Sequence, residues 1–429
     1  MRTIFAFLLS SFAKRIIKRF RPMVIGITGS VGKSSTKEAV YLVLKQFQPA
    51  IRKTPSNFNN QIGLPLSIIG IDFLPGYNLW LWLKVFMLAV WRLLFSNNYP
   101  KILVLEYGID RPGDMDQLVA IAKPDLAVLT DIGWSHLQFF ADQNELANEK
   151  AKLLGSLSHA GTAIINNDNP LVVSKAGNLK NFDHLTSYGF DNLGTLTANI
   201  LFEKVGINPQ TKIKLNNGLE LTIPAVGKAH YYACLAAIAV VKSLGYDWQL
   251  AATALTGYQP MPGRMNILKG QDQTFILDDC YNAAPNSMKE ALRLLSLAEA
   301  KHKTAVIGDM LELGSATIPA HHELGKNLAE FGFDQVVIVG QYADSVKQGA
   351  LTSGLSEAKI SCFANSQQAA DFLISHLVNG SAVLVKGSQR VRMEKIVKMI
   401  MADPSQARCF RLRLRLQSAR LPPSNLEPE

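Results

Sequence analysis

The sequence predicts an α/β protein with two domains: a central domain with a mainly parallel sheet, followed by a smaller Rossmann-like α/β domain. Three observations favour this fold class. A Gly-rich loop follows the first apolar run, and short apolar runs alternate with helical patterns on both sides of residues 260–270. The chain of 429 residues, 48% of them hydrophobic, is long enough for two or three hydrophobic cores. We place the domains at residues 23–262 and 263–403, between an N-terminal segment, 1–22, and a disordered tail, 404–429.

The N-terminal segment predicts a basic amphipathic helix over residues 1–21. Its basic residues follow the apolar stretch and no small-residue cleavage site is seen, unlike in a signal peptide. Phe12, Ile16 and Phe20 share one face, and the cations lie largely elsewhere. The net charge of +10 suggests nucleic acid or an anionic membrane as a partner. Because no nucleic-acid-binding motif accompanies the cations, we favour a membrane surface and expect no nucleic-acid partner.

The stretch "GITGSVGKSSTKEAV", residues 26–40, predicts a phosphate-binding loop between a strand, 23–27, and a helix, 36–47. Glycines let backbone N–H groups turn inward, and the helix N-terminus adds positive potential. The first glycine of the usual GxxxxGK[ST] spacing is replaced by Ile27, but the consecutive Gly-Lys-Ser-Ser favours a nucleotide over a ligand-free turn. The central domain is therefore predicted to be a P-loop ATPase domain. Its expected nucleotide-binding residues are Gly29, Ser30, Gly32, Lys33, Ser34 and Ser35.

A second apolar segment, "YNLWLWLKVFMLAVWRLLF", is inserted at residues 77–95. Its length suggests a membrane span, but Lys84 and Arg92 interrupt it and its three tryptophans suit an interface. A single span would also put the phosphate loop and everything after Lys101 on opposite sides of a membrane. Two interpretations stay open: contact with a membrane surface, or a buried helix hairpin or protein-partner surface.

The remaining elements continue the alternation. Residues 101–108, 125–133 and 161–168 predict buried parallel strands, with a helix in 109–124. Residues 195–224 predict a short antiparallel segment, with a hairpin that turns at Asn-Gly. Residues 230–245 predict a helix. A second series of strands is predicted at 274–279, 303–309, 335–340 and 381–387.

Three polar residues lie at or after predicted strand ends, where parallel sheets bind ligands. Glu106 ends "LVLE", His136 follows "AVLTDIGWS", and Lys150 lies on the next helix. Taken singly, such a Glu is often a helix cap, a lone His is more often structural and a helical Lys is usually solvated. Together with the phosphate loop, they predict a set that holds one or two Mg²⁺ ions beside phosphate oxygens.

An ordered series of motifs runs from about residue 23 to residue 399. It comprises "GITGSVGKSST", "TPSNFNNQIGLPLS", "LEYGIDRPGDM", "IGWSHLQFF", "NEKAKLL", "INNDNP", "PGRMNIL", "DDCYNAAPNSM", "GDMLELG" followed by His321, and "VLVKGSQRVRME". This series resembles the Mur ligases, the ATP-dependent amide-bond-forming enzymes of peptidoglycan synthesis. Within that family it is most similar to the MurF branch, for which the two motifs "DDCYNAAPNSM" and "GDMLELG" are specific.

The resemblance implies a mechanism. A substrate carboxylate attacks the γ-phosphate of ATP to give an acyl phosphate, and an amine then displaces phosphate to leave an amide. By resemblance, Lys33 neutralises the transferred phosphoryl group, and Ser34 and Glu106 hold the first Mg²⁺. His136 holds the second, with Lys150 matching the family's carbamylated lysine.

The resemblance also implies roles near the second domain. Arg264 and Asp279 match positions that contact the nucleotide. Asn57, Asn59 and Asn60 match a loop that lines the substrate channel. The substrate face of the second domain is expected to include Asn282, Ser287 and Lys386.

Two departures from the family pattern bear on recognition. The helix that usually opens Gly-x-His-Asn-x-x-Asn-Ala reads "GKAHYYACLAA", so base recognition must differ, and we expect His230 to take part. Only 22 residues precede the first strand, so the family's usual N-terminal UDP-sugar-binding domain is expected to be lacking. We expect either the apolar segments to bring the protein to a lipid-linked substrate or a partner protein to supply the missing domain.

The four scattered cysteines form no CxxC pair, which indicates a reducing compartment. We therefore expect a cytoplasmic protein, peripheral at the inner face of the cell membrane. The leading hypothesis is a MurF-like ligase that joins a muramoyl-peptide carboxylate to an amino acid or dipeptide amine. The alternatives are a folylpolyglutamate-like ligase acting on another carboxylate and a non-catalytic, nucleotide-binding scaffold at the membrane surface.

Overall fold

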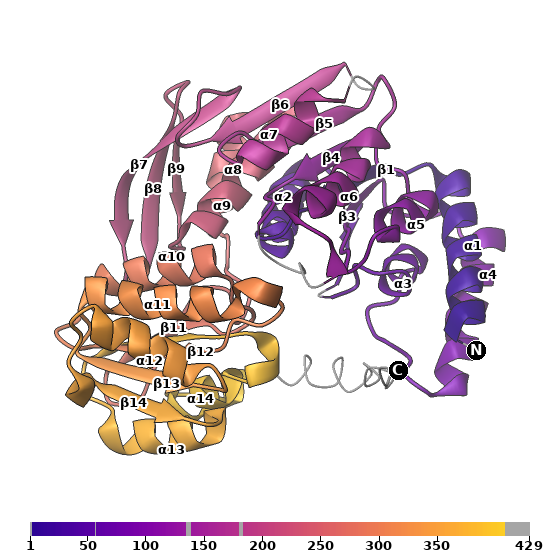
Figure 1. The fold of residues 1–429 in the computed structure, drawn as a ribbon. Coiled ribbons are helices and arrows are strands. Elements are labelled where there is room, and N and C mark those ends of the chain that lie inside the picture. The colour runs from indigo at the N-terminus through magenta and orange to yellow at the C-terminus, as the bar shows by residue number, and fades with distance from the viewer. Residues whose placement is uncertain (1, 56, 134–138, 180–182, 408–429) are drawn as a thin grey trace.

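The computed structural model describes residues 2–55, 57–133, 139–179 and 183–407, which form two α/β units (Figure 1). The first unit carries a sheet with the strand order β2-β3-β1-β4-β5-β6-β7-β8-β9. Its strands pair in parallel from β2 to β7 and antiparallel from β7 to β9. The strands are β1 (Met23–Thr28), β2 (Ile51–Lys53), β3 (Ile102–Glu106), β4 (Leu126–Leu129), β5 (Thr162–Asn166), β6 (His184–Gly189), β7 (Leu196–Lys204), β8 (Gln210–Leu215) and β9 (Glu220–Ile223).

The central strands are buried on both faces, because alternate side chains enter two different cores. In β3, Leu103 and Leu105 face one core, and Ile102 and Val104 face the other. The first core is covered by α1 (Arg2–Phe20), α3 (Gly63–Ile69), α4 (Leu79–Leu94), α5 (Asp114–Ile121), α6 (Gln143–Gly155) and α7 (Pro170–Gly177). The second is covered by α2 (Lys33–Phe47), α8 (Lys228–Ser243) and α9 (Trp248–Leu255).

The helix predicted over residues 1–21 is present as α1, and it packs on α3 and α4. Leu9, Ala13 and Ile16 are fully buried against the rest of the first unit. The insertion at 77–95 also folds as one helix, α4, which buries Trp82 and only two other side chains. Within the described ranges, no helix is both long enough and apolar enough to cross a bilayer.

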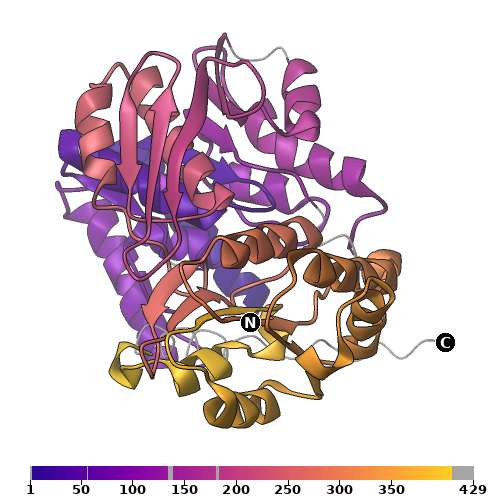
Figure 2. The ribbon, with the colours of Figure 1, turned by 90° about the vertical axis from the view of Figure 1, so that its left-hand side faces the viewer.

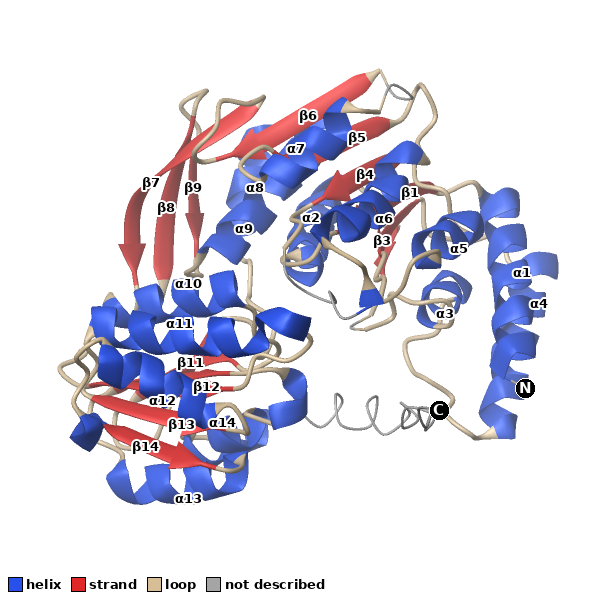
Figure 3. Ribbon diagram, in the orientation of Figure 1, coloured by secondary structure: helices blue, strands red, loops and turns tan. Residues whose placement is uncertain are grey.

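The second unit has a sheet with the order β10-β11-β15-β12-β13-β14, parallel except for β10. Its strands are β10 (Asn266–Lys269), β11 (Phe275–Asp279), β12 (Lys303–Gly308), β13 (Gln335–Val339), β14 (Ile360–Phe363) and β15 (Ala382–Lys386). Helices cover both faces of this sheet (Figure 3). They are α10 (Pro285–Ser296), α11 (Thr317–Phe331), α12 (Ala343–Thr352), α13 (Ser366–His376) and α14 (Glu394–Ile400), with 3-10 turns η2 (Gly314–Ala316), η3 (Glu357–Lys359), η4 (Gln389–Val391) and η5 (Pro404–Ala407).

The predicted α/β class is confirmed, and the predicted strands of both series form. The edge strands β2, β10 and β14 were not predicted, because short half-buried runs lack the apolar signal of central strands. The tail predicted to be disordered from residue 404 begins instead with η5; residues 408–429 lie outside the described part of the chain.

The second unit lies directly below the antiparallel strands β7 to β9 in two perpendicular views (Figures 1 and 2). Two contacts join the units there. Val205 forms a β-bridge with Ala298, and Arg293 of α10 pairs with Glu203 of β7 at 3.0 Å. These contacts hold the C-terminal end of α10 against the end of β7.

Candidate active site

The loop between β1 and α2 requires glycine at two positions. Gly32 has φ +85°, in the left-handed region, immediately before α2 begins at Lys33. A Cβ on Gly29 would lie 2.1 Å from Oγ1 of Thr130, at the end of β4. The hydroxyl of Ser30 accepts a hydrogen bond from the N–H of Gly133 at 2.9 Å. The loop therefore lies closely against the segment that follows β4.

Two lysine amines meet at this loop. Nζ of Lys33 donates to the carbonyl of Gly29 at 2.6 Å and to that of Ser30 at 3.2 Å. Nζ of Lys150, from α6, donates to the same Gly29 carbonyl at 3.1 Å, and Lys150 is only 1% exposed. Burial lowers the pKa of both amines, that of Lys150 well below its ordinary value, and the charge of Lys33 lowers the pKa of Lys150 further. Two amines that gain positive charge only against this burial favour an anionic ligand beside them.

Glu106 ends β3 beside these amines and is nearly fully buried. Its Oε2 accepts from Nζ of Lys37 at 3.3 Å, and its Oε1 accepts from Nδ2 of Asn59 at 3.0 Å. Burial by itself would raise the pKa of Glu106, but the cations of Lys37 and Lys33 more than offset this and lower the pKa to about 2. Glu106 is therefore a fixed carboxylate at any physiological pH.

Arg264, in the linker between α9 and β10, reaches the loop from the side of the second unit. Its Nη2 donates to the hydroxyl of Ser34 at 3.4 Å, and its guanidinium carbon lies 4.0 Å from the ring centre of Tyr281. The hydroxyl of Tyr281 in turn donates to Oδ1 of Asn57 at 2.8 Å. Nε of Arg264 is buried without a hydrogen-bond partner. A buried donor with no acceptor, next to Lys33, fits an anionic oxygen of a ligand.

A further carboxylate, Asp131, lies just after β4. Its Oδ1 accepts from Nδ2 of Asn169 at 2.6 Å, and its charge acts on both Lys33 and Lys150. Burial raises the pKa of Asp131, and the bond from Asn169 and the two lysines oppose that shift. Glu106, at the end of β3, and Asp131, after β4, thus lie on the two sides of β1, and Asp110 also acts on both amines.

The predicted residues of the second unit form a network at the end of β11 and β15. Asp279 accepts from the N–H of Met265 at 3.0 Å and pairs with Nζ of Lys386 at 2.5 Å. Lys386 is 2% exposed and also donates to the carbonyl of Asn282 at 3.0 Å. The side chain of Ser287 instead bonds to the backbone of Ala284, at the start of α10. Asp279 and Lys386 therefore position the linker and the 280–284 loop, while Asn282 is exposed.

Three other predicted residues make contacts inside the protein. Oδ1 of Asn60 caps the start of α3, and the buried hydroxyl of Ser35 bonds to Tyr258. His230 is 1% exposed, with Nδ1 at 2.8 Å from the hydroxyl of Tyr258 and Nε2 at 2.9 Å from the carbonyl of Arg264. Burial lowers the pKa of His230 to about 4. Direct contact with a base would require His230 to break one of these bonds, so it positions the linker.

His136 lies outside the described residues. Within the described ranges, which omit it, no group of three or more His, Cys, Asp and Glu side chains is arranged to hold a metal. The oxygen donors that are described, the hydroxyl of Ser34 and the ionised carboxylate of Glu106, are of the kind that Mg²⁺ prefers. Both lie near Arg264, whose charge also acts on Glu106. The donor set thus fits a magnesium ion at this loop.

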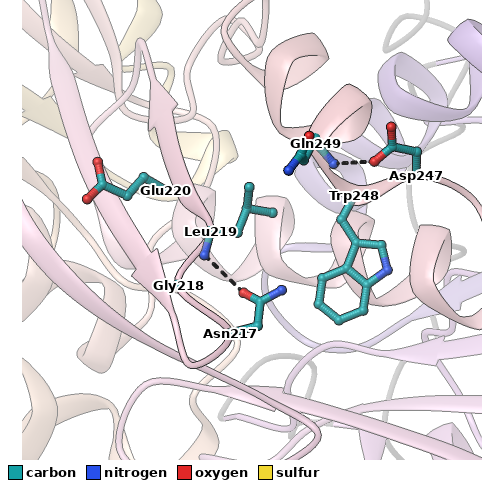
Figure 4. Close-up of a pocket in the computed structure, with 7 residues that line it drawn as sticks. All are labelled: Asn217, Gly218, Leu219, Glu220, Asp247, Trp248 and Gln249. Atoms are coloured by element: carbon teal, nitrogen blue, oxygen red, sulfur yellow. Dashed lines mark hydrogen bonds between the residues drawn. The ribbon is translucent and has the colours of Figure 1, made fainter.

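A surface pocket at the antiparallel extension shares no residue with this site. Asn217, in the β8–β9 turn, faces Trp248 at the start of α9 (Figure 4). The side chains of Asn217 and Asp247 accept from the N–H groups of Leu219 and Gln249, at 3.1 and 2.8 Å. These polar groups are satisfied by local turns, so we assign the pocket no function.

The sequence analysis missed three residues of the site, although the sequence contains a signal for each of them. Lys37 lies one helical turn after Lys33, on the same face of α2. Asp131 lies just after β4, in the same way that Glu106 lies at the end of β3. Both positions are at the edge of the sheet where ligands bind. Tyr281 lies inside the quoted "DDCYNAAPNSM" motif, but its reach to Asn57 depends on the packing of the two units.

Known proteins share this architecture. The Mur ligase middle domain matches residues 90–241, and the Mur ligase, glutamate ligase domain matches residues 263–389. The UDP-N-acetylmuramoyl-tripeptide–D-alanyl-D-alanine ligase of Bacillus subtilis (strain 168) is 30% identical over 400 residues, which are 92% of this chain and 79% of that protein. Crystal structure I of MurF from Acinetobacter baumannii superposes with a TM-score of 0.76 at 25% identity, covering 93% of this chain and 81% of that one. MurF ligase from Thermotoga maritima in complex with ADP gives a TM-score of 0.74 at 25% identity, covering 96% and 84%.

Proposed function

The chain belongs to the Mur ligase family, and we propose that it is a MurF-type, ATP-dependent ligase of peptidoglycan precursor synthesis. Its carboxylate substrate is a UDP-N-acetylmuramoyl-tripeptide and its amine substrate is D-alanyl-D-alanine, the compounds that the name of the Bacillus subtilis relative states. The reaction forms a carbon–nitrogen bond and converts ATP to ADP and phosphate.

One observation carries this proposal: the convergence of cations from both units on the glycine-rich loop. Lys33 and Lys150 meet at Gly29, and Arg264 reaches the loop from the linker with a buried Nε that has no partner. The cations of Lys33 and Arg264 complement the negative charge of a nucleoside triphosphate. Because Arg264 comes from the linker, nucleotide binding also joins the two units.

Each step follows from that arrangement. An oxygen of the tripeptide carboxylate attacks the γ-phosphorus, and the bond from phosphorus to ADP breaks, while Lys33 stabilises the charge of the transferred group. The amine of D-alanyl-D-alanine then attacks the acyl carbon, and phosphate leaves as the amide forms and the amine loses a proton. Ser34 and Glu106 would hold one Mg²⁺ and His136 a second, and these ions would neutralise phosphate charge.

We assign Lys150 as a carbamylated residue. Its neutral amine forms a bond to the carbon of CO₂ and releases a proton, so that a neutral group becomes an anion. Burial supplies the neutral amine, and the contact of Lys150 with Gly29 places it beside Lys33. The carbamate would replace the repulsion between the two amines with an ion pair and would add oxygen donors for the second Mg²⁺.

The substrates are expected to enter between the loop at residues 57–60 and the loop at 280–284. Asn57 and Tyr281 hold these loops together across the two units at 2.8 Å. Asn59 links the first loop to Glu106, so substrate binding there is coupled to the metal ligand. We place the reaction in the cytoplasm, where ATP and nucleotide-linked precursors are available, at the inner face of the membrane.

The test is ADP and phosphate release by the full chain with UDP-N-acetylmuramoyl-tripeptide and D-alanyl-D-alanine, with Lys33→Ala as the inactive control. The proposal expects release that needs both substrates and a product with the mass of the pentapeptide. Release that depends instead on a folate and glutamate would establish the alternative ligase. ATP binding without turnover on either pair would establish a nucleotide-binding scaffold.

A further inference from the structure

The outer side of α4 is a continuous apolar surface. Five large side chains follow one another at spacings of three and four residues and so share one face of the helix. They are Trp80, Leu83, Met87, Trp91 and Leu94, of which Trp80 is 75% and Leu94 63% exposed. Tyr77 and Phe95 extend the surface at its two ends, and both are largely exposed. We call these seven residues the α4 face.

The α4 face is held rigidly by α1. Trp82, on the opposite side of α4, stacks on Phe5 of α1 with ring centres 5.0 Å apart. The guanidinium of Arg19 donates to the carbonyls of Arg92, Leu93 and Ser96, which caps the end of α4. Because the inner side of α4 is already occupied, the α4 face cannot turn inward to be buried.

The charged residues of α1 and α4 are all of one sign. No Asp or Glu occurs in residues 1–37 or in residues 73–105, which include all of α1 and α4. Lys84 lies among the apolar residues of the α4 face, one position from Leu83, and is exposed. On α1, Lys14 and Lys18 are exposed and follow Phe7 at helical spacing, and Phe7 is itself 73% exposed. The α4 face therefore carries Lys84 among its apolar side chains, and the helix packed beside it, α1, adds exposed cations.

We propose that the α4 face and the adjoining cations of α1 dock on an anionic lipid bilayer, with α4 lying in the interface. This combination of a tryptophan-rich apolar stripe and lysines is what an interfacial helix needs. The lysine stems extend past the apolar layer, and their ammonium groups meet lipid phosphates. The inference stands on the surface alone and does not depend on the ligase assignment.

Two other arrangements fit the surface less well: a helix that spans the bilayer, and a second copy of the chain. The 16 residues of α4 span about 24 Å, which is shorter than the roughly 30 Å core of a bilayer, so α4 lies on a bilayer and does not cross it. A second copy of the chain would bring two faces of the same positive sign together, which is unfavourable. An anionic bilayer satisfies both the apolar and the cationic parts of the surface.

The position of the surface is compatible with catalysis. α1 and α4 lie at the flank of the first unit farthest from the second unit (Figure 1). The glycine-rich loop and Arg264 lie between the two units, so docking through α4 leaves that region open.

The experiment is co-sedimentation of the full chain with vesicles of phosphatidylcholine alone or with phosphatidylglycerol added. We expect binding to the anionic vesicles that weakens at least fivefold between 50 and about 500 mM salt, because surface charges are screened. Tryptophan emission should shift to shorter wavelength on binding, since Trp80 and Trp91 leave water.

Matched variants separate the two parts of the surface. Trp80→Ser with Trp91→Ser should lower vesicle binding at least tenfold, whereas Leu193→Ser with Ile318→Ser, at apolar residues exposed elsewhere, should not change it. Lys14→Glu with Lys18→Glu should abolish the preference for anionic lipid, whereas Lys269→Glu with Lys301→Glu, in the second unit, should retain it. All these substitutions are at exposed positions, and circular dichroism and ATP hydrolysis check that the fold and the active site remain intact.

Three results would overturn the proposal. Equal recovery in the supernatant with and without anionic vesicles would exclude a bilayer. Equal binding by the Trp80→Ser, Trp91→Ser variant and its control would place any lipid contact elsewhere. Concentration-dependent dimers by light scattering that Trp91→Ser dissociates, with no vesicle binding, would assign the α4 face to a second copy of the chain. Loss of ligase activity with binding retained would count against the proposed function alone.

Discussion

Lys33 and Lys150 donate to the same oxygen, the carbonyl of Gly29, at 2.6 and 3.1 Å. The two amines come from α2 and α6, helices on opposite faces of the first sheet. Burial lowers the pKa of both amines, and the charge of Lys33 lowers the pKa of Lys150 further, so the charged form of Lys150 is disfavoured at this carbonyl. A bound polyphosphate would relieve that conflict, so the arrangement stabilises the nucleotide complex more than the free protein.

Lys33→Ala should lower the ligation rate by about 1,000-fold or more, because it removes a cation that stabilises the transferred phosphoryl group. The melting temperature should stay within a few degrees of the wild type, since removing one of two buried cations costs the free fold little. Steady-state phosphate release and thermal unfolding measure the two effects. Lys45→Ala, at an exposed lysine of the same helix, is the control. Near-normal turnover in Lys33→Ala would refute the phosphate-loop assignment.

Lys37→Met should destabilise the fold by about 3 kcal/mol at pH 7, because it leaves the buried carboxylate of Glu106 without its ion-pair partner. The pKa of Glu106 is about 2, below its ordinary value of 4.5, so the ion pair stabilises the protein fully above pH 4.5 and is lost as the pH falls through 2. The deficit of the variant should therefore shrink as the pH is lowered from 7 to 3. Urea unfolding across that range, with Lys45→Met as control, checks it; a pH-independent deficit would contradict it.

Glu106→Gln and His136→Ala should each raise the Mg²⁺ concentration for half-maximal activity by about tenfold, because each removes one proposed metal ligand. The amide keeps the bond from Asn59 possible, so Glu106→Gln tests charge and not shape. Glu323→Gln, on α11, is the matched control. The two-ion assignment fails if the Mg²⁺ requirement of both variants equals that of the wild type.

Lys150 should carry one CO₂ in the active enzyme, detectable by ¹³C NMR after incubation with ¹³C-bicarbonate. Lys150→Ala should be inactive and should regain part of its activity with millimolar acetate or formate, which restore a carboxylate in the gap. Lys152→Ala, at a half-exposed lysine two residues away, should keep activity and label uptake. An unlabelled Lys150 in a fully active sample would refute the modification.

Tyr281→Phe should raise the KM for the tripeptide about fivefold with a smaller change in kcat, because one hydrogen bond of about 1 kcal/mol across the units is lost. Asn57→Ala should have a similar effect, and the double variant should be no worse than either single one, since both remove the same bond. Tyr246→Phe, whose ring stacks on Phe47, is the control. If the increases in KM of the two single variants added up in the double variant, the two side chains would act independently, and the hydrogen bond between them would play no part in binding.

The sequence by itself was sufficient for the fold class and the family, and it predicts the phosphate loop. Buried parallel strands are continuous apolar runs, and a phosphate loop needs glycines and a lysine at set spacing, so both are local signals. The same reasoning identified Glu106 and Lys150, because strand ends and the following helices can be counted along the chain. The amphipathic helix at the N-terminus was likewise predictable from its 3.6-residue period.

The tertiary structure decided which polar groups meet. The pairing of Lys37 with Glu106 and the contact of Tyr281 with Asn57 join residues 69 and 224 positions apart. No local pattern reports such distances, because they depend on how helices pack on the sheet and how the second unit lies against the first. The same holds for His230, whose two ring nitrogens are both bonded inside the protein. The tertiary structure also decided which side of residues 77–95 is buried: α4 packs Trp82 against α1 and leaves Trp80 and Trp91 exposed. The sequence of an almost uniformly apolar helix does not contain this division.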